Sequence, residues 1–208
     1  MQLEAKNLGF RYGANGKWLF KELNLIIHSG ERIGIVASSG FGKSTLAKLL
    51  AGYEKPVEGE ILLDGAPLPK RGFSPVQLIY QHPENAINPR WRMKQVLAES
   101  NSLENSTSDL LLHNIGIETA WLERFPRELS GGELQRFCIA RALSEGTKFL
   151  LADEISTMLD VITQAQIWDL ILNEVKNRNL GLLVVTHNPA LANRVCERVI
   201  DLRELVCQ

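Results

Sequence analysis

A glycine-rich loop that ends in a lysine and two hydroxyl residues is the strongest chemical signal in this sequence. The apolar run 33–36 predicts a buried strand before the loop, and leucines at helical spacing predict a helix after it, capped at Gly52. Gly40 and Gly42 allow the backbone to curl so that its N–H groups point at phosphate oxygens, and the helix adds its positive dipole end. The residues expected to bind a nucleotide are Ser38, Ser39, Gly40, Phe41, Gly42, Lys43, Ser44 and Thr45.

Two side chains of this loop have separate expected roles. Lys43 would reach the β- and γ-phosphates, and the Ser44 hydroxyl would take a place on Mg²⁺. The usual pattern begins with Gly, whereas this chain has Ala37 there. Because Ala disfavours positive φ, the loop must enter with an ordinary backbone, and we expect nucleotide binding to survive. The alternative is a glycine-rich turn that only packs a helix on a strand.

Two carboxylates, Asp153 and Glu154, directly follow the apolar run 149–152. Ligands bind at the carboxyl ends of the strands in a parallel sheet, so both side chains are expected beside the phosphate loop. Asp153 would hold Mg²⁺ through a water, and Glu154 would orient or deprotonate the water that attacks the γ-phosphate. Taken alone, the pair would also fit a solvated acidic turn.

Ser130 followed by Glu133 predicts a capping box at the start of a helix that runs toward Leu143. Gly131 and Gly132 lie inside the first turn, where each costs about 1 kcal/mol relative to Ala. That cost makes sense if a ligand approaches the bare backbone, so this helix start is a candidate second anion site. The alternative is simply a well-capped helix.

The remaining pattern predicts an α/β fold. The runs 148–152 and 182–186 are apolar almost throughout, as in strands of a parallel sheet covered by helices, and the segment 163–178 between them is a predicted helix. The mixed segment 91–128 predicts a helical lobe, with a hydrophilic break at 101–108. Other strands are expected near 3–12, 23–27, 60–63, 78–80 and 199–202.

Size and composition narrow the class of protein. The 208 residues make one domain, or one domain with an inserted lobe, and the net charge of −1 gives no reason to expect nucleic-acid binding. Three scattered cysteines fit a reducing compartment. No secretory signal and no apolar run of membrane-spanning length is present, so we expect a soluble protein whose membrane role comes through a partner.

Together these motifs resemble those of ATP-binding cassette (ABC) ATPases, in the same order and rough spacing from Tyr12 to His187. The resemblance implies a P-loop NTPase (RecA-like) core with a parallel sheet, an N-terminal antiparallel β subdomain and an inserted α-helical subdomain. The single ABC ATPase domain would cover 1–208, with catalytic core and β subdomain at 1–80 and 148–208 and the helical subdomain at about 86–147. The motifs that carry the resemblance are residues 40–45, Gln81, 129–133, 153–154, 156–160 and His187.

The resemblance also implies roles for further residues. Tyr12 would stack on adenine (the alternative is an aromatic residue in a small β core). Gln81 would contact Mg²⁺ and the attacking water, and His187 would bond the γ-phosphate and help to position Glu154. Two cassettes would meet head to tail, so that one chain completes the ATP site of the other. The residues acting on the partner's ATP would be Ser130, Gly131, Gly132, Glu133 and Asp160.

Segments 82–90 and 159–167 look like the peptide and nickel importer branch of the family. The resemblance then implies an ATP-hydrolysing importer subunit on the cytoplasmic side of the cell membrane, moving peptides, nickel or metal–chelator complexes. Its partners would be a second ATPase subunit, identical or paralogous, permease subunits reached through 88–90 and 124–128, and indirectly a substrate-binding protein. The alternatives are a soluble non-transport ABC ATPase and a regulatory, weakly active half of an asymmetric pair.

Two positions depart from the family pattern: Ile155 replaces a usual Pro, and Met158 replaces a usual Ala. Both lie in the loop after Glu154, so they put the tightness or symmetry of the dimer contact in doubt.

Overall fold

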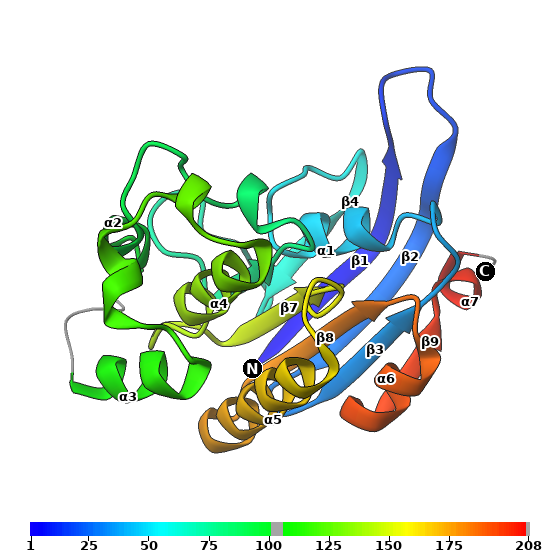
Figure 1. Cartoon of the computed structure of the whole chain (residues 1–208). Coiled ribbons are helices and arrows are strands. Elements are labelled where there is room, and N and C mark those ends of the chain that lie inside the picture. Colours follow the sequence, from blue (N-terminus) through cyan, green and yellow to red (C-terminus); the bar gives the residue numbers. More distant parts are fainter. Residues whose placement is uncertain (101–105, 207–208) are drawn as a thin grey trace.

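The computed structural model describes residues 1–100 and 106–206 (Figure 1). The hydrophilic break expected at 101–108 therefore lies partly outside the described residues, and α3 begins at Ser106. The strands are β1 (Gln2–Arg11), β2 (Trp18–His28), β3 (Arg32–Val36), β4 (Glu58–Leu63), β5 (Ala66–Pro67), β6 (Val76–Ile79), β7 (Phe149–Asp153), β8 (Gly181–Thr186) and β9 (Arg198–Asp201). The α-helices are α1 (Lys43–Leu50), α2 (Met93–Ala98), α3 (Ser106–Ile115), α4 (Gly131–Ala142), α5 (Val161–Arg178), α6 (Pro189–Val195) and α7 (Leu202–Val206), and the 3₁₀ helices are η1 (Pro83–Asn85), η2 (Thr119–Glu123) and η3 (Pro126–Glu128).

Two sheets organise the chain. The strands β2, β1, β4 and β5 form an antiparallel sheet in that order, and β6, β7, β8, β3 and β9 form a parallel sheet. This confirms the predicted P-loop NTPase type of fold, with an N-terminal antiparallel sheet and a parallel core. The last strand was predicted at 199–202 and lies one residue earlier, at Arg198–Asp201, because Leu202 already belongs to α7.

The continuous apolar runs are explained by burial on both faces of the parallel sheet. Along β7, Leu150 and Ala152 pack with α4 and α5 in one core cluster, while Phe149 and Leu151 pack with α1 and the antiparallel sheet in a second one. Residues of β8 alternate between the same two clusters. A strand buried on both sides needs no polar positions, which is why its sequence shows no alternation.

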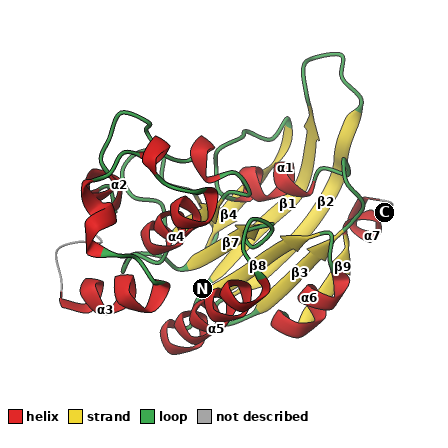
Figure 2. Cartoon of the chain, viewed as in Figure 1, coloured by secondary structure: helices red, strands yellow, loops and turns green. Residues whose placement is uncertain are grey.

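Between β6 and β7 the regular elements among the described residues are all helices, joined by turns and loops. Figures 1 and 2 show α2, α3 and α4 gathered on one side of the parallel sheet, away from the β1–β2 hairpin. α4 connects this group of helices to the parallel sheet, since its residue Phe137 lies in the core cluster that also contains Leu150 of β7. The helix that begins at Ser130 is therefore packed against the sheet that carries the carboxylates.

None of the helices in the described part of the chain is both long enough and apolar enough to cross a bilayer.

Candidate functional site

The glycine-rich loop joins β3 to α1, as the sequence predicted. Gly40 and Gly42 have φ of 84° and 89°, so both adopt the left-handed conformation that glycine tolerates best. A Cβ at Gly42 would also come within 2.7 Å of the Leu19 side chain. Ala37 has no positive φ, which agrees with the expectation that the loop enters with an ordinary backbone. The predicted cap also forms, with Gly52 at φ 78° after α1.

The ammonium group of Lys43 points back into this loop. Lys43 is 6% exposed, and its Nζ donates to the carbonyl oxygens of Ala37 at 2.9 Å and Ser38 at 3.2 Å. Both partners are neutral, so the loop keeps a positive charge at the place where the sequence predicts phosphates. An anion there would be attracted more strongly than in bulk water, because the site is partly buried.

Asp153 ends β7 and is nearly buried, with 3% of its surface exposed. Burial raises the pKa of its carboxyl group, the side-chain hydrogen bond with Ser44 opposes that rise, and the neighbouring Glu154 adds to it. One carboxylate oxygen, Oδ1, is buried without a hydrogen-bond partner among the described residues. A buried anion beside a serine hydroxyl at the phosphate loop is the arrangement that a divalent cation would neutralise.

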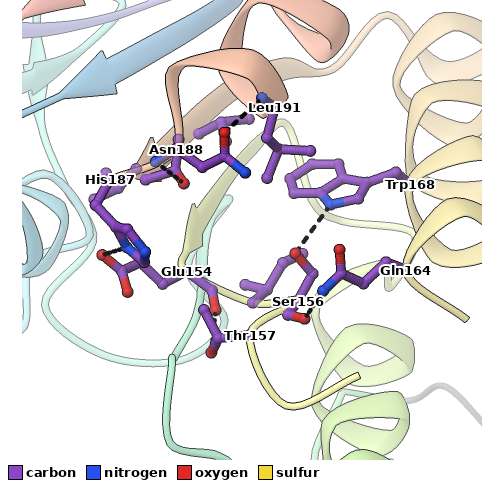
Figure 3. A pocket seen from close by; sticks show the side chains of 12 residues that line it. Glu154, Ser156, Thr157, Gln164, Trp168, His187, Asn188 and Leu191 are labelled. Atoms are coloured by element: carbon purple, nitrogen blue, oxygen red, sulfur yellow. Dashed lines mark hydrogen bonds and ion pairs between the residues drawn. The ribbon is translucent and has the colours of Figure 1, made fainter. Parts of the chain in front are cut away.

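Glu154 has its carboxylate held from two sides. Its Oε1 lies 3.0 Å from Nδ1 of His187, and its Oε2 accepts a hydrogen bond from Nε2 of Gln81 at 3.1 Å. The three residues follow β7, β8 and β6, so neighbouring parallel strands deliver them to one edge of the sheet. Figure 3 shows the contact between Glu154 and His187.

The backbone of Glu154 is strained. Its φ is 49°, a conformation that costs a non-glycine residue of order 1–3 kcal/mol and that clusters at functional sites. Its N–H donates to the carbonyl of Val185 at 2.9 Å, which holds the turn in place. Sequence reasoning did not predict this conformation, because a glutamate gives no local sign of positive φ.

A cavity of about 400 Å³ is lined by Glu154, the first three residues of the loop 155–159, the end of β8, α5 and the start of α6 (Figure 3). The loop is tied to α5, since Gln164 Nε2 donates to the carbonyls of Ser156 and Leu159, at 2.6 and 3.2 Å, and Trp168 Nε1 donates to Ser156 Oγ at 3.3 Å. These α5 contacts were not anticipated from the sequence. They hold the loop against α5.

Ser130 begins α4 with the predicted capping box. The Glu133 N–H donates to Ser130 Oγ at 3.3 Å, and the Ser130 N–H donates to Glu133 Oε2 at 2.6 Å. The backbone hydrogen bond from Ser130 is the main cause that lowers the pKa of Glu133. A Cβ on Gly131 or Gly132 would approach a side chain of the loop, Met158 or Leu159, to 3.2 Å. The glycines therefore also let this loop pack closely on the helix start.

A second surface hollow, of about 520 Å³, combines Ser130, Gly131 and Gly132 with Met158 and Asp160. We call it the Ser130 hollow.

Asp160 caps α5, where it accepts from the N–H groups of Ile162 and Thr163, both at 3.0 Å. The hydrogen bonds to Thr163 are the main cause that lowers its carboxyl pKa. Of the two unusual loop residues, Ile155 is buried in the core, whereas Met158 is exposed and lines the Ser130 hollow.

Tyr12 lies beyond β1 with 58% of its surface exposed, so it is no part of a β core. Its hydroxyl lies 2.7 Å from Oγ1 of Thr45, and its ring meets Phe10 edge-on with centroids 5.0 Å apart. Two contacts thus hold an exposed aromatic ring over the end of the phosphate loop. The exposure speaks against the alternative of an aromatic residue in a small β core, and stacking on adenine stays a prediction.

These features define a P-loop NTPase. Among solved structures, the dimeric bacterial ABC transporter cassette MJ0796 is similar, with a TM-score of 0.80, 26% identity and coverage of 96% of this chain and 93% of that one. Residues 20–157 match the family described as ABC transporter, and the chain belongs to this family. It is the ATP-binding subunit of a transporter and hydrolyses ATP.

Two relatives share more of the sequence. The nickel import ATP-binding protein NikE of Rhodospirillum rubrum is 37% identical over 205 residues, which cover 90% of this chain and 73% of the relative. The nickel import system ATP-binding protein NikE of Staphylococcus aureus is 34% identical over 212 residues, with coverage of 97% and 87%. The resemblance stated from the motifs is thereby confirmed at the level of the family.

Proposed function

We propose that this chain energises the import of nickel, or of a related small solute such as a peptide or metal–chelator complex, by hydrolysing ATP on a dimer of cassettes. The names of the two relatives support nickel, and segments 82–90 and 159–167 support the wider branch. The observation that carries the hydrolytic part is the carboxylate of Glu154, held between Gln81 and His187 beside the buried Asp153.

ATP binds with its phosphates on residues 38–45 and its adenine on the exposed ring of Tyr12. Lys43 exchanges its carbonyl partners for the β- and γ-phosphate oxygens, which is favourable because a charged acceptor binds an ammonium more strongly than a neutral one. Stacking on Tyr12 is tolerant of small displacements, since it uses the face of the ring.

Glu154 accepts a proton from the water that attacks the γ-phosphorus, while the bond between that phosphorus and the leaving ADP oxygen breaks. His187 and Gln81 keep the carboxylate in one orientation. The carboxylate therefore loses less rotational freedom on reaching the transition state, which lowers the entropic part of the barrier. His187 would also bond the γ-phosphate.

Ser44, Gln81 and Asp153 are the residues that would hold Mg²⁺. The unpaired Oδ1 of Asp153 and the hydroxyl of Ser44 fit a hard cation that prefers oxygen ligands and keeps several waters. When bound, the ion supplies charge neutralisation for the phosphate oxygens.

A second cassette, a copy or a paralogue, completes each ATP site. The N–H groups at the start of α4 and the hydroxyl of Ser130 line a hollow apart from the cavity beside Glu154, as expected if they serve the ATP of another chain. Glu133 and Asp160 support this surface, since each caps a helix that borders it.

We place the dimer on the cytoplasmic face of the membrane, docked on permease subunits through residues 88–90 and 124–128, with a substrate-binding protein as indirect partner. In this region the guanidinium carbons of Arg92 and Arg127 lie 4.8 and 5.8 Å from the centroid of the Phe125 ring. The docking surface belongs to the stretch 86–147, which we treat as the helical subdomain, with 1–80 and 148–208 as the catalytic core and β subdomain.

The variant Glu154→Gln tests the proposal. It keeps the shape and the contacts with Gln81 and His187 but cannot accept the proton, so ATP-dependent dimerisation persists while steady-state hydrolysis falls by at least about 100-fold, within the usual contribution of a general base. The exposed Glu60 of β4 gives the matched control, because Glu60→Gln makes the same change away from the site.

Normal turnover by Glu154→Gln in the assembled transporter would refute the catalytic assignment. The substrate is tested separately, by ⁶³Ni²⁺ uptake in cells that carry the wild type or Glu154→Gln with their permease subunits. If neither Glu154→Gln nor deletion of the chain lowers nickel uptake, nickel is refuted as the cargo.

A further inference from the structure

Three side chains of α4 donate hydrogen bonds to three carbonyl oxygens of the segment that follows β6. The pairs are Gln135 Nε2 with Tyr80 O at 3.2 Å, Cys138 Sγ with Pro83 O at 3.9 Å, and Arg141 Nη2 with Ala86 O at 2.7 Å. Donors and acceptors both advance by three residues, so one face of the helix follows the segment along its length. We call this segment, residues 80–86, the α4-bound segment.

The end pair at Arg141 and the middle pair at Cys138 differ in strength. Arg141 is charged, and its other nitrogen Nη1 donates to Glu99 at 2.9 Å, so its contact with Ala86 is a firm, charge-assisted one. Cys138 is a weak donor, although burial raises its pKa to about 12 and keeps the proton on the sulfur. Arg141 therefore anchors the far end of the segment, which leaves Gln135 to fix the near end.

Gln135 is unusual for a buried residue. It is 1% exposed, and its Oε1 is buried without a hydrogen-bond partner in the part of the chain that the structure describes. An apolar side chain of similar shape would avoid the unpaired Oε1, but it would also take the hydrogen bond from the carbonyl of Tyr80. The cost is consistent with a use for the other end of the amide, which is the Nε2 contact with Tyr80.

Tyr80 directly precedes Gln81, whose side chain holds Glu154. The same helix begins at Ser130, in the hollow that a second cassette would cover. We propose that Gln135 is a positioning residue: by holding the Tyr80 carbonyl on α4, it sets where Gln81 meets the carboxylate of Glu154. The inference rests on the proposed roles of Gln81 and Glu154 and adds a link from the partner-facing helix to the hydrolytic site.

Gln135→Met tests the link in the full-length chain. Met keeps length and helix propensity but removes the donor, so we expect kcat for ATP hydrolysis to fall about tenfold, while the dissociation constant for ATP stays within about twofold. The matched control is Gln77→Met, since Gln77 Nε2 also donates to a backbone carbonyl, Ser74 O at 2.7 Å, away from the site. Amide hydrogen exchange of residues 81–86 is expected to quicken in Gln135→Met alone.

A double-mutant cycle separates positioning from general damage. If Gln135 acts through Gln81, then adding Gln135→Met to Gln81→Ala lowers kcat no further. A fully additive loss would overturn the proposal. So would a Gln135→Met chain with wild-type kcat and unchanged exchange at 81–86, or one that loses thermal stability and ATP affinity together with kcat.

The two proposals fail in distinguishable ways. Wild-type turnover by Glu154→Gln sinks the catalytic assignment, whatever Gln135→Met does. If Gln135→Met has wild-type kcat and amide exchange while Glu154→Gln is inactive, only the proposed link through α4 is refuted.

Discussion

Replacing Asp153 by Asn should make the nucleotide-free protein more stable while it abolishes ATP hydrolysis. The carboxylate is 3% exposed, its Oδ1 has no partner among the described residues, and burial raises its pKa. Burying a polar group without a hydrogen-bond partner costs about 1–3 kcal/mol in desolvation, and a charged group costs more than a neutral one. Because the Asn amide is neutral, the substitution removes part of this desolvation penalty. The expected gain is roughly 1–2 kcal/mol in the free energy of unfolding.

For a domain of this size, each kcal/mol moves the midpoint of thermal unfolding by about 2–4 °C, so the variant should melt roughly 2–8 °C higher. The gain should depend on pH with a defined sign. Because the folded pKa of Asp153 lies above the ordinary value of 3.8, the ionised carboxylate destabilises the fold at neutral pH. The advantage of Asn should therefore shrink as the pH falls through the folded pKa, where the wild-type carboxyl becomes neutral.

Asp201, at the end of β9, provides a control of opposite sign. The side-chain hydrogen bond with Arg203 lowers its carboxyl pKa to about 2, so its ionised form stabilises the folded state. Asp201→Asn should lower the melting temperature at neutral pH, and the difference should fade as the pH falls toward 2. Differential scanning calorimetry of both variants from pH 8 down to about pH 2.5 makes the comparison, because the Asp201 difference fades only below the ordinary carboxyl pKa of 3.8.

The reasoning would be refuted if Asp153→Asn melted at or below the wild-type temperature at pH 8. A gain that grew on acidification would refute it as well. Addition of Mg²⁺ and ATP should raise the melting temperature of the wild type but not of Asp153→Asn, since binding to the folded state stabilises it by mass action.

Two further results are expected. Tyr12→Phe should weaken ATP binding only a few-fold, because the ring stays while the hydrogen bond to Thr45 is lost. Tyr12→Ala should weaken it about tenfold or more in equilibrium titration. Equal ATP affinities of the wild type and both variants would contradict stacking. If two copies of this chain form the dimer, mixing inactive Lys43→Ala and Ser130→Ala chains should restore up to a quarter of the wild-type rate in an ATPase assay. Half of the dimers are then mixed, and each mixed dimer holds one intact composite site out of two. If mixed dimers form but activity does not return, completion of the site by the partner is contradicted.

Local sequence was enough for the phosphate loop and for the start of α4. Glycines at 40 and 42, a lysine and a following helix encode the turn by their own backbone preferences, and Ser130 with Glu133 encodes a cap by hydrogen bonds only three residues long. The family resemblance named Gln81 and His187, and it did so through motif order rather than through any contact that the sequence could reveal.

Tertiary structure alone decided how those residues meet. Glu154 is held by side chains 73 and 33 residues away in the chain, because the order β6, β7, β8 places three strand ends side by side. The unpaired oxygen of Asp153, the positive φ of Glu154 and the contact of Gln135 with Tyr80 follow from packing across the sheet. Sequence patterns report local preference, whereas burial and long-range hydrogen bonds depend on which distant segments the fold brings together.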